Sequence, residues 1–256
     1  MYALLAGAPL TAASAADLWK APPSAPAGYS WTGCYINGGV GYGIWEQPHF
    51  LFDSPGGTLE STTTNSAGEG WLGRVGAGCD YQASRFVFGV FGDYDLTALS
   101  GTFDDPASGW SDDEKEKGAW AVGGRIGYVV TPSLLTYFNG GYTQARFDQS
   151  NLVTAYSLPP LGAPTGVAIG AQTYSGWFLG GGAEFALSDF VPISGLFLRT
   201  EYRFAHYNPK NAQLVCVSAG SACAAVGSPE PFAYNIQNDV QTVTTGIVWR
   251  FNYGGR

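Results

Sequence analysis

Two histidines, His49 and His206, are the side chains that could act as a general base near neutral pH. A Ser-His-Asp arrangement could be assembled around either one, and its chemistry would be hydrolysis. Neither histidine, however, lies in the strand–turn–helix sequence context that positions a catalytic serine. A lipid hydrolase therefore stays open only as a minor alternative, and the ordinary explanation of His206 is an interfacial ring near a strand end.

The other chemical groups do not have the spacing of a metal or nucleotide site. The four cysteines include no Cys-x-x-Cys pair, and His49 and His206 are the only histidines. The glycines of Gly39-Val-Gly41-Tyr-Gly43 recur at every second position, unlike those of a dinucleotide-binding loop, and neither a phosphate-binding loop nor an EF-hand occurs. We therefore expect no catalytic residue, no metal and no cofactor.

The cysteines fall into two groups. Cys216 and Cys223 share one long connection and could close a small disulfide loop in an oxidising compartment. Cys34 and Cys79 fall on the apolar side of two neighbouring segments. Because buried thiols behave as small apolar groups, we interpret this second pair as packing residues.

Ten charged residues recur at alternate positions, on the same side as glycines and small polar residues. Five are cations and five are anions. They are Arg74, Asp80, Asp93, Asp95, Arg125, Glu184, Arg199, Glu201, Arg203 and Arg250. Because isolated buried ions are costly, the equal numbers favour a mutually paired network in a filled interior. The alternative is a charged selectivity ring, which would require one sign to dominate.

The elements that must position these charges are strands of period two. In residues 31–45, one parity holds Cys34, Ile36, Val40, Tyr42 and Ile44, and the other is rich in glycine. Successive side chains of a strand point to opposite faces. Large apolar groups on one face, small groups on the other and aromatic residues near the ends are typical of a strand between lipid and a crowded polar interior.

Eight segments share this alternation. They cover residues 31–45, 70–82, 85–97, 118–130, 134–145, 173–187, 196–207 and 240–253. Short connections (83–84, 131–133 and 188–195) alternate with long ones (46–69, 98–117, 146–172 and 208–239). This order predicts an all-β, eight-stranded antiparallel up-and-down transmembrane β-barrel with short periplasmic turns and four long extracellular loops. A soluble β-sandwich is the alternative, but it has no reason to alternate its connections in this way.

Composition supports the same class. The chain has 256 residues, of which 12% are charged and 37 are glycine. Typical soluble domains are nearer ~25% charged. No apolar run reaches the ~20 residues of a membrane helix, and an eight-stranded barrel has an interior that side chains can fill.

The first 30 residues predict a targeting segment and a short linker, followed by one domain. Residues 2–11 are weakly apolar and Ala12-Ala13-Ser14-Ala15 resembles a cleavage site, so we expect a signal peptide over residues 1–15 whose true start codon could lie upstream. Residues 16–30 are rich in proline and alanine and predict a periplasmic lead-in. The barrel is expected over residues 31–256.

The long connections carry most of the net charge of −8. The first holds four acids and no base, and the second holds six acids and two lysines. We expect these groups to form a solvated acidic face. Such a face argues against nucleic acid and against anionic lipid headgroups as direct ligands.

Several motifs, in order, carry a resemblance to a known family. They are Trp31-Thr-Gly-Cys-Tyr-Ile-Asn-Gly-Gly-Val-Gly-Tyr-Gly, Gly89-Val-Phe-Gly-Asp93, Gly124-Arg-Ile-Gly-Tyr128, Gly180-Gly-Gly-Ala-Glu184 and Arg199-Thr-Glu-Tyr202. Together they resemble the alphaproteobacterial outer-membrane β-barrel surface proteins, OmpA-like barrels that carry the porin family label. Phe91 departs from this pattern, because the family usually has an inward acid there. Five residues also follow Phe251, where the family commonly ends.

The resemblance implies a Gram-negative outer-membrane protein that supports the cell envelope and interacts through its loops. Its implied partners are outer-membrane lipid and lipopolysaccharide, the barrel-assembly machinery during insertion, and host or surface ligands. The main hypothesis is a non-enzymatic structural or surface-interaction barrel. A small-solute porin is the first alternative and a barrel lipid hydrolase is the second.

Overall fold

A computed structural model describes residues 30–54, 56–156, 160–187, 190–219, 223 and 225–251. The predicted signal peptide, and all of the predicted lead-in except Ser30, lie outside the described residues. Within this part of the chain, no helix has the length and apolar character needed to span a membrane.

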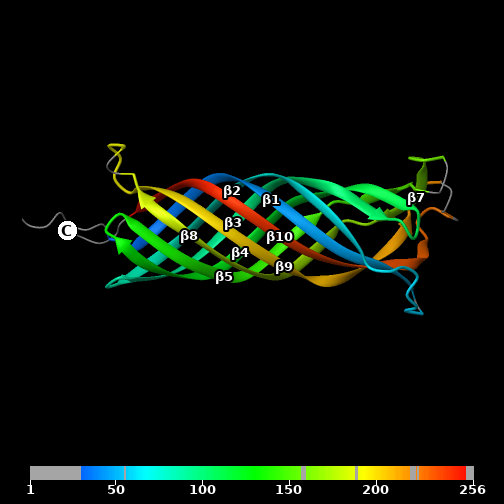
Figure 1. Cartoon of the computed structure of the whole chain (residues 1–256), viewed down its shortest axis with the longest axis horizontal. Helices are drawn as coiled ribbons and strands as arrows, with labels where there is room; N and C mark the ends of the chain where they lie inside the picture. Colours follow the sequence, from blue (N-terminus) through cyan, green and yellow to red (C-terminus); the bar gives the residue numbers. More distant parts are fainter. Residues whose placement is uncertain are drawn as a thin grey trace, which may run out of the picture.

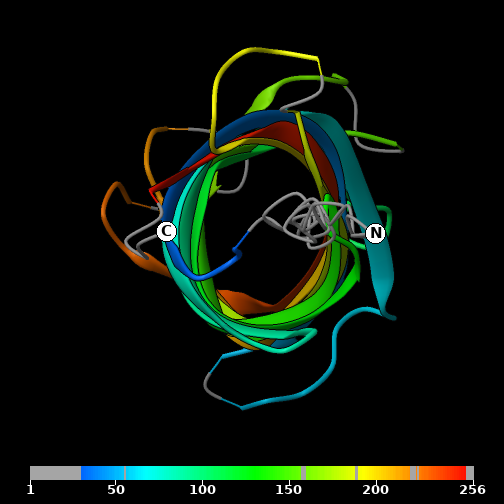
Figure 2. The same cartoon turned by 90° about the vertical axis from the view of Figure 1, so that its left-hand side faces the viewer.

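Ten antiparallel strands make up the fold. They are β1 (Gly33–Asp53), β2 (Thr64–Ala83), β3 (Phe86–Asp105), β4 (Trp110–Thr131), β5 (Leu134–Phe147), β6 (Ser150–Thr154), β7 (Pro164–Ile169), β8 (Gln172–Ala186), β9 (Leu196–Cys216) and β10 (Pro229–Phe251). Eight of them, all except β6 and β7, follow one another round a ring that the β10–β1 pairing closes. Figure 2 shows this ring end-on, and the predicted antiparallel barrel is confirmed.

The two ends of the barrel differ. The tight connections β2–β3, β4–β5 and β8–β9 lie at the end where Cys34 pairs with Phe251, and we call this the turn end. The longer connections lie at the opposite end, the loop end, which is at the right in Figure 1. Most strands extend further toward the loop end than the alternation predicted, so much of the predicted loop sequence forms barrel wall.

At the loop end, the barrel wall has a different strand order. We call this part of the wall, in which β6 and β7 lie between β4 and β9, together with the connections beyond it, the collar. Because β5 and β8 stop early, the hairpin of β6 and β7 takes their place in the wall. Trp110 of β4 pairs with Thr154 of β6, and Cys216 of β9 pairs with Val167 of β7. The wall therefore continues beyond the ends of β5 and β8.

The outer surface is apolar, with an aromatic belt near each end. The outward prediction is confirmed, since Tyr42, Phe88, Trp177 and Ile247 are 38%, 48%, 44% and 41% exposed. The loop-end belt consists of Tyr42, Trp71, Tyr94, Trp120, Tyr142 and Trp177, and the turn-end belt consists of Tyr81, Phe86, Tyr128, Phe185 and Trp249. Such belts mark the two membrane interfaces, so the band between them is the predicted lipid-facing part.

The interior is filled in layers. An apolar cluster that includes Trp31 and Phe197 closes the turn end, and a larger one that includes Trp45 and Phe103 occupies the loop end. The inward charges lie between these clusters. The inward charged side chains fit because neighbouring inward positions are glycine. A Cβ at Gly89, for example, would overlap the Asp80 carboxylate.

Candidate functional site

All ten charged residues that the sequence placed inward lie in the middle of the barrel and form two groups. The turn-side group contains Asp80, Arg125, Glu184, Arg199 and Arg250. The loop-side group contains Arg74, Asp93, Asp95, Glu201 and Arg203. Each group brings together side chains from strands that are distant in sequence.

In the turn-side group, one carboxylate binds three guanidinium groups. Glu184 forms ion pairs of 2.6 Å with Arg125, 2.6 Å with Arg199 and 2.5 Å with Arg250. Asp80 pairs with Arg125 and, at 2.6 Å, with Arg250. Three arginines therefore face two acids, which leaves this group with an excess of one positive charge.

The loop-side group has the opposite excess. Arg74 binds both carboxylate oxygens of Asp95, at 2.6 and 2.7 Å, and Arg203 binds both oxygens of Asp93, at 2.8 and 2.7 Å. Glu201 lies between the two arginines, 2.8 Å from Arg74 and 2.9 Å from Arg203. Three acids face two arginines here, so the charges of the two groups cancel.

Neutral donors complete the coordination of Glu201. Its second carboxylate oxygen accepts hydrogen bonds of 2.8 Å from the Tyr137 hydroxyl and 2.8 Å from the Asn139 amide. The side chain of Glu201 is 5% exposed. A buried charge is tolerated when its oxygens are satisfied in this way.

Aromatic rings cover the guanidinium planes. The Tyr35 ring centroid lies 4.7 Å from Arg125, 4.7 Å from Arg199 and 4.9 Å from Arg250. Phe178 lies 4.4 Å from Arg203. Cation–π contacts at these distances stabilise the arginines and fill the space between them.

Two cavities touch the charged groups. One lies beside Gly39, Gly246 and Arg74, the other between Arg74, Glu116 and Tyr207, and each has a volume of about 20 Å³. A cavity of this size holds about one water molecule. The ion pairs and the rings that cover them therefore form a packed ionic core, and each of these two cavities has space for a single water.

The collar contains three buried acids where the sequence predicts a solvated face, so that prediction is wrong for these three residues. Asp105, Glu114 and Glu116 are 0%, 7% and 3% exposed. The reason is that β3 and β4 continue as barrel wall beyond the aromatic belt, so every second residue still points inward. Asp105 accepts a hydrogen bond of 2.7 Å from Tyr234.

Glu114 and Glu116 have no basic partner among the described residues. Glu114 accepts a hydrogen bond of 2.9 Å from Gln47, and one buried oxygen of each glutamate lacks a hydrogen bond in the described structure. Both lie on the loop side of Trp120, outside the lipid-facing band. Burial raises the pKa of Glu114 to about 7 and that of Glu116 to about 8, so they are largely protonated in mildly acidic solution.

These two glutamates predict an alkaline loss of stability. Each pKa is raised above its ordinary value of 4.5, so the folded state binds more protons than the unfolded state between pH 4.5 and about 8. Their contribution is complete below pH 4.5 and is lost as the pH rises through about 8. The melting temperature, measured by circular dichroism in detergent, is expected to be lower at alkaline than at mildly acidic pH.

Glutamine imitates the protonated carboxyl group, so the variant Glu114→Gln/Glu116→Gln is the matched control. Its melting temperature should change less over the same pH range. An equal drop in variant and wild-type protein would assign the pH dependence to other groups.

The prediction that Cys34 and Cys79 are packing thiols is wrong. They form a disulfide with a Cα–Cα distance of 3.9 Å. The two residues are directly opposite in the β1–β2 register, on the outward face. Parity placed them on the same face, but only the register brings their sulfur atoms together.

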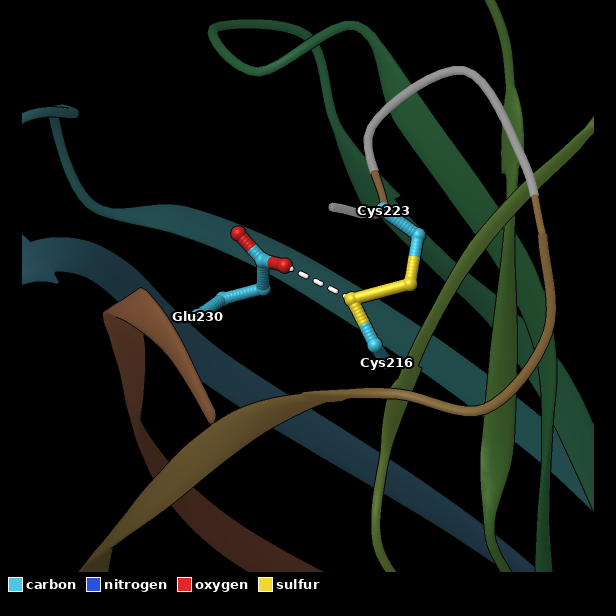
Figure 3. Close-up of side chains that lie close together, drawn as sticks. All are labelled: Cys216, Cys223 and Glu230. Carbon is cyan, nitrogen blue, oxygen red and sulfur yellow. Dashed lines mark hydrogen bonds between the residues drawn. A yellow bond between two sulfur atoms is a disulfide. The ribbon is translucent and has the colours of Figure 1, made fainter. Parts of the chain in front are cut away.

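The other cysteine pair lies in the collar. Cys216, at the end of β9, is joined to Cys223 by a disulfide, and Glu230 of β10 points at it (Figure 3). The Cys216 sulfur lies 2.8 Å from a Glu230 oxygen. These three residues have the spacing of metal ligands, but zinc and similar metals bind cysteine as thiolate, and here both sulfurs are in the disulfide.

The histidines do not form a catalytic triad in the described structure. His49 is 1% exposed and stacks on Phe103 with ring centroids 4.1 Å apart. His206 lies on the outer surface, and its Nδ1 is 2.7 Å from Asp239. No serine hydroxyl among the described residues is hydrogen-bonded to either ring.

Comparisons with known proteins agree with this architecture. The sequence matches the profile of the outer membrane protein β-barrel domain over residues 3–251. It is 30% identical over 201 residues to a 31 kDa outer-membrane immunogenic protein of Brucella melitensis. This alignment covers 75% of this chain and 81% of the Brucella protein. It is 25% identical over 208 residues to a 25 kDa outer-membrane immunogenic protein of Brucella abortus, with coverage of 79% and 80%.

A solved structure supports the fold. The outer membrane protein OprG from Pseudomonas aeruginosa superimposes with a TM-score of 0.54 at 14% sequence identity, over 88% of this chain and 98% of that chain. At this identity the likeness concerns the barrel architecture alone.

Proposed function

Because this chain belongs to the outer membrane protein β-barrel domain family, we propose that it is a non-enzymatic surface protein of the outer membrane that supports the envelope as a solid barrel and makes contacts through its collar. Its location in the outer membrane, among lipids, follows from the family. The mechanical and contact roles are the proposal.

The packed ionic core is the observation that carries the proposal. A transport pore needs a continuous aqueous path, whereas the ten inward charges are paired with one another and covered by Tyr35 and Phe178. A hydrolase needs an activated nucleophile, and the hydrogen bonds of His49 and His206 offer none among the described residues. A rigid scaffold that presents a surface is the function that this interior supports best.

The collar is suited to contact with other molecules. Its connections carry exposed apolar side chains: Leu59, Leu161 and Val226 are 67%, 65% and 68% exposed. Exposed loops on a rigid scaffold are where binding residues concentrate. We propose that host or surface ligands bind here, that lipopolysaccharide surrounds the barrel below, and that the barrel-assembly machinery inserts the chain.

A gene deletion in the native bacterium tests the envelope role. The deletion should increase sensitivity to detergent, and wild-type protein should restore resistance. A variant in which residues 56–61 of the β1–β2 connection are replaced by a glycine–serine linker should restore resistance equally, because that connection lies outside the barrel wall. Unchanged detergent sensitivity in the deletion strain would contradict the proposal.

A further inference from the structure

The Glu230 carboxylate in the collar contacts a sulfur atom that has no proton to share with it. One carboxylate oxygen lies 2.8 Å from Sγ of Cys216 (Figure 3), but a sulfur in a disulfide carries no hydrogen. This is the one side-chain contact of hydrogen-bond length that the carboxylate makes among the described residues. In the oxidised protein, the carboxylate therefore faces a group that neither donates a proton nor carries a positive charge.

The backbones of Cys216 and Glu230 are held by hydrogen bonds that do not involve the disulfide. Cys216 pairs with Val167 of β7 in the register, and its N–H donates a hydrogen bond of 3.0 Å to the Ser228 carbonyl. The Gln213 side chain donates a hydrogen bond of 2.5 Å to the Glu230 backbone carbonyl. Because these contacts do not depend on the S–S bond, we expect the two side chains to remain close together when that bond is broken.

Two sulfur atoms and one carboxylate oxygen form a donor set that suits zinc. The Sγ atoms of Cys216 and Cys223 and a Glu230 oxygen all lie within 4.8 Å of one another. Zinc takes thiolate and carboxylate ligands in tetrahedral sites and accepts a water as the fourth ligand. Calcium and magnesium require oxygen ligands, so two sulfur donors select against them. Once the cysteines are thiolates, the three groups carry like charges that repel one another, and a bound cation removes this repulsion.

We propose that reduction of the Cys216–Cys223 disulfide converts this part of the collar into a binding site for one zinc ion. The reductant is a low-molecular-weight thiol of the glutathione class. Two molecules of this thiol supply two electrons that break the S–S bond, and they leave joined as their own disulfide while their two protons pass to the cysteine sulfurs. Zinc then displaces both protons and binds the two thiolates and the Glu230 carboxylate. This inference does not depend on the proposed function.

Zinc should favour reduction of this disulfide and not of the other one. Zinc binds the thiolates but not the disulfide, so it stabilises the reduced form by mass action. Cys34 and Cys79 are the internal control, because no third metal-binding side chain joins them among the described residues. At a fixed ratio of reduced to oxidised glutathione, zinc should raise the reduced fraction of Cys216 and Cys223 and leave that of the control pair unchanged. Alkylation followed by peptide mass spectrometry measures both fractions in one sample.

The affinity for zinc tests the role of the carboxylate. It is measured without oxygen on folded protein in detergent micelles, by competition with a chromophoric chelator, and we expect one zinc per reduced chain and none in the oxidised protein. Loss of a residue that only supports a metal ligand typically costs about 10–100-fold in affinity, so Glu230→Gln, which removes a ligand, should cost roughly tenfold or more. Glu60→Gln removes an exposed carboxylate elsewhere in the collar and should bind zinc as the wild type does.

Cobalt(II) in place of zinc identifies the sulfur donors, because thiolate ligands give it an intense charge-transfer absorption. This absorption should appear in the reduced wild type and be absent from Cys216→Ala/Cys223→Ala, with heat-modifiable gel migration as the check that each barrel is closed. The inference is overturned if the reduced wild type binds no zinc, if Glu230→Gln binds zinc as tightly as the wild type, or if the Cys216→Ala/Cys223→Ala variant still binds it. Zinc that raises the reduced fraction of Cys34 and Cys79 instead would also overturn it.

Discussion

Replacing Glu184 with glutamine is expected to destabilise the barrel by about 3–5 kcal/mol, the cost of removing one partner from a buried ion pair. The carboxylate is 0% exposed and binds Arg125, Arg199 and Arg250. Without its charge, three arginines would share the single charge of Asp80. Urea unfolding in detergent, followed by tryptophan fluorescence, measures the loss.

Two controls separate this effect from a general response to substitution. Glu69→Gln removes an exposed, outward carboxylate and should change stability little. Adding Arg199→Gln to Glu184→Gln lowers the excess in this group from two positive charges to one, as in the wild type, so the double variant should be more stable than the sum of the single effects predicts. A Glu184→Gln barrel as stable as the wild type would show that the charges are not mutually dependent.

Removal of the Cys34–Cys79 disulfide is expected to have the second-largest effect. The bridge closes a sequence separation of 45 residues, and the chain-entropy relation gives about 4 kcal/mol for a loop of this size. We expect the variant Cys34→Ala/Cys79→Ala to lose its heat-resistant gel migration at a lower temperature than the wild type. Alanine is chosen because it places no hydroxyl on the outward face.

The second disulfide of the chain is the matched control. Cys216 and Cys223 are separated by 7 residues, for which the same relation gives about 2.5 kcal/mol. The Cys216→Ala/Cys223→Ala variant should therefore unfold at a temperature between those of the wild type and the first variant. If the Cys216→Ala/Cys223→Ala variant instead unfolds at a lower temperature than the Cys34→Ala/Cys79→Ala variant, the Cys34–Cys79 disulfide is not the main covalent stabiliser of the barrel.

Much of the barrel follows from period two alone. Alternation in residues 31–45 and its seven repeats put Tyr42 and Trp177 outside and Arg74 and Glu184 inside, because the face of a side chain depends only on parity. The extra length of the strands was not predicted, since acids such as Glu114 and Glu116 beyond the belt look the same whether solvated or inside a collar. A signal did exist: the same alternation continues through both residues.

The partners within the core could not be predicted. Parity places Arg74 and Glu201 inside, but their contact joins residues 127 apart in sequence and depends on the curvature and stagger of the closed sheet. The same holds for Cys34 and Cys79, whose bridge needs the β1–β2 register. The β6–β7 hairpin was missed because its two strands are short and lie in a segment with little alternation.

Paired ions and aromatic rings fill the middle of the barrel, so the folded protein should not conduct ions. Planar-bilayer recording of purified, folded wild-type protein tests it most directly, with heat-modifiable gel migration as the check that the barrel is closed. We expect a flat baseline, because an ion would have to cross the paired carboxylates and guanidinium groups without a water-filled path. Steady, reproducible current steps of one size from the folded protein would contradict it.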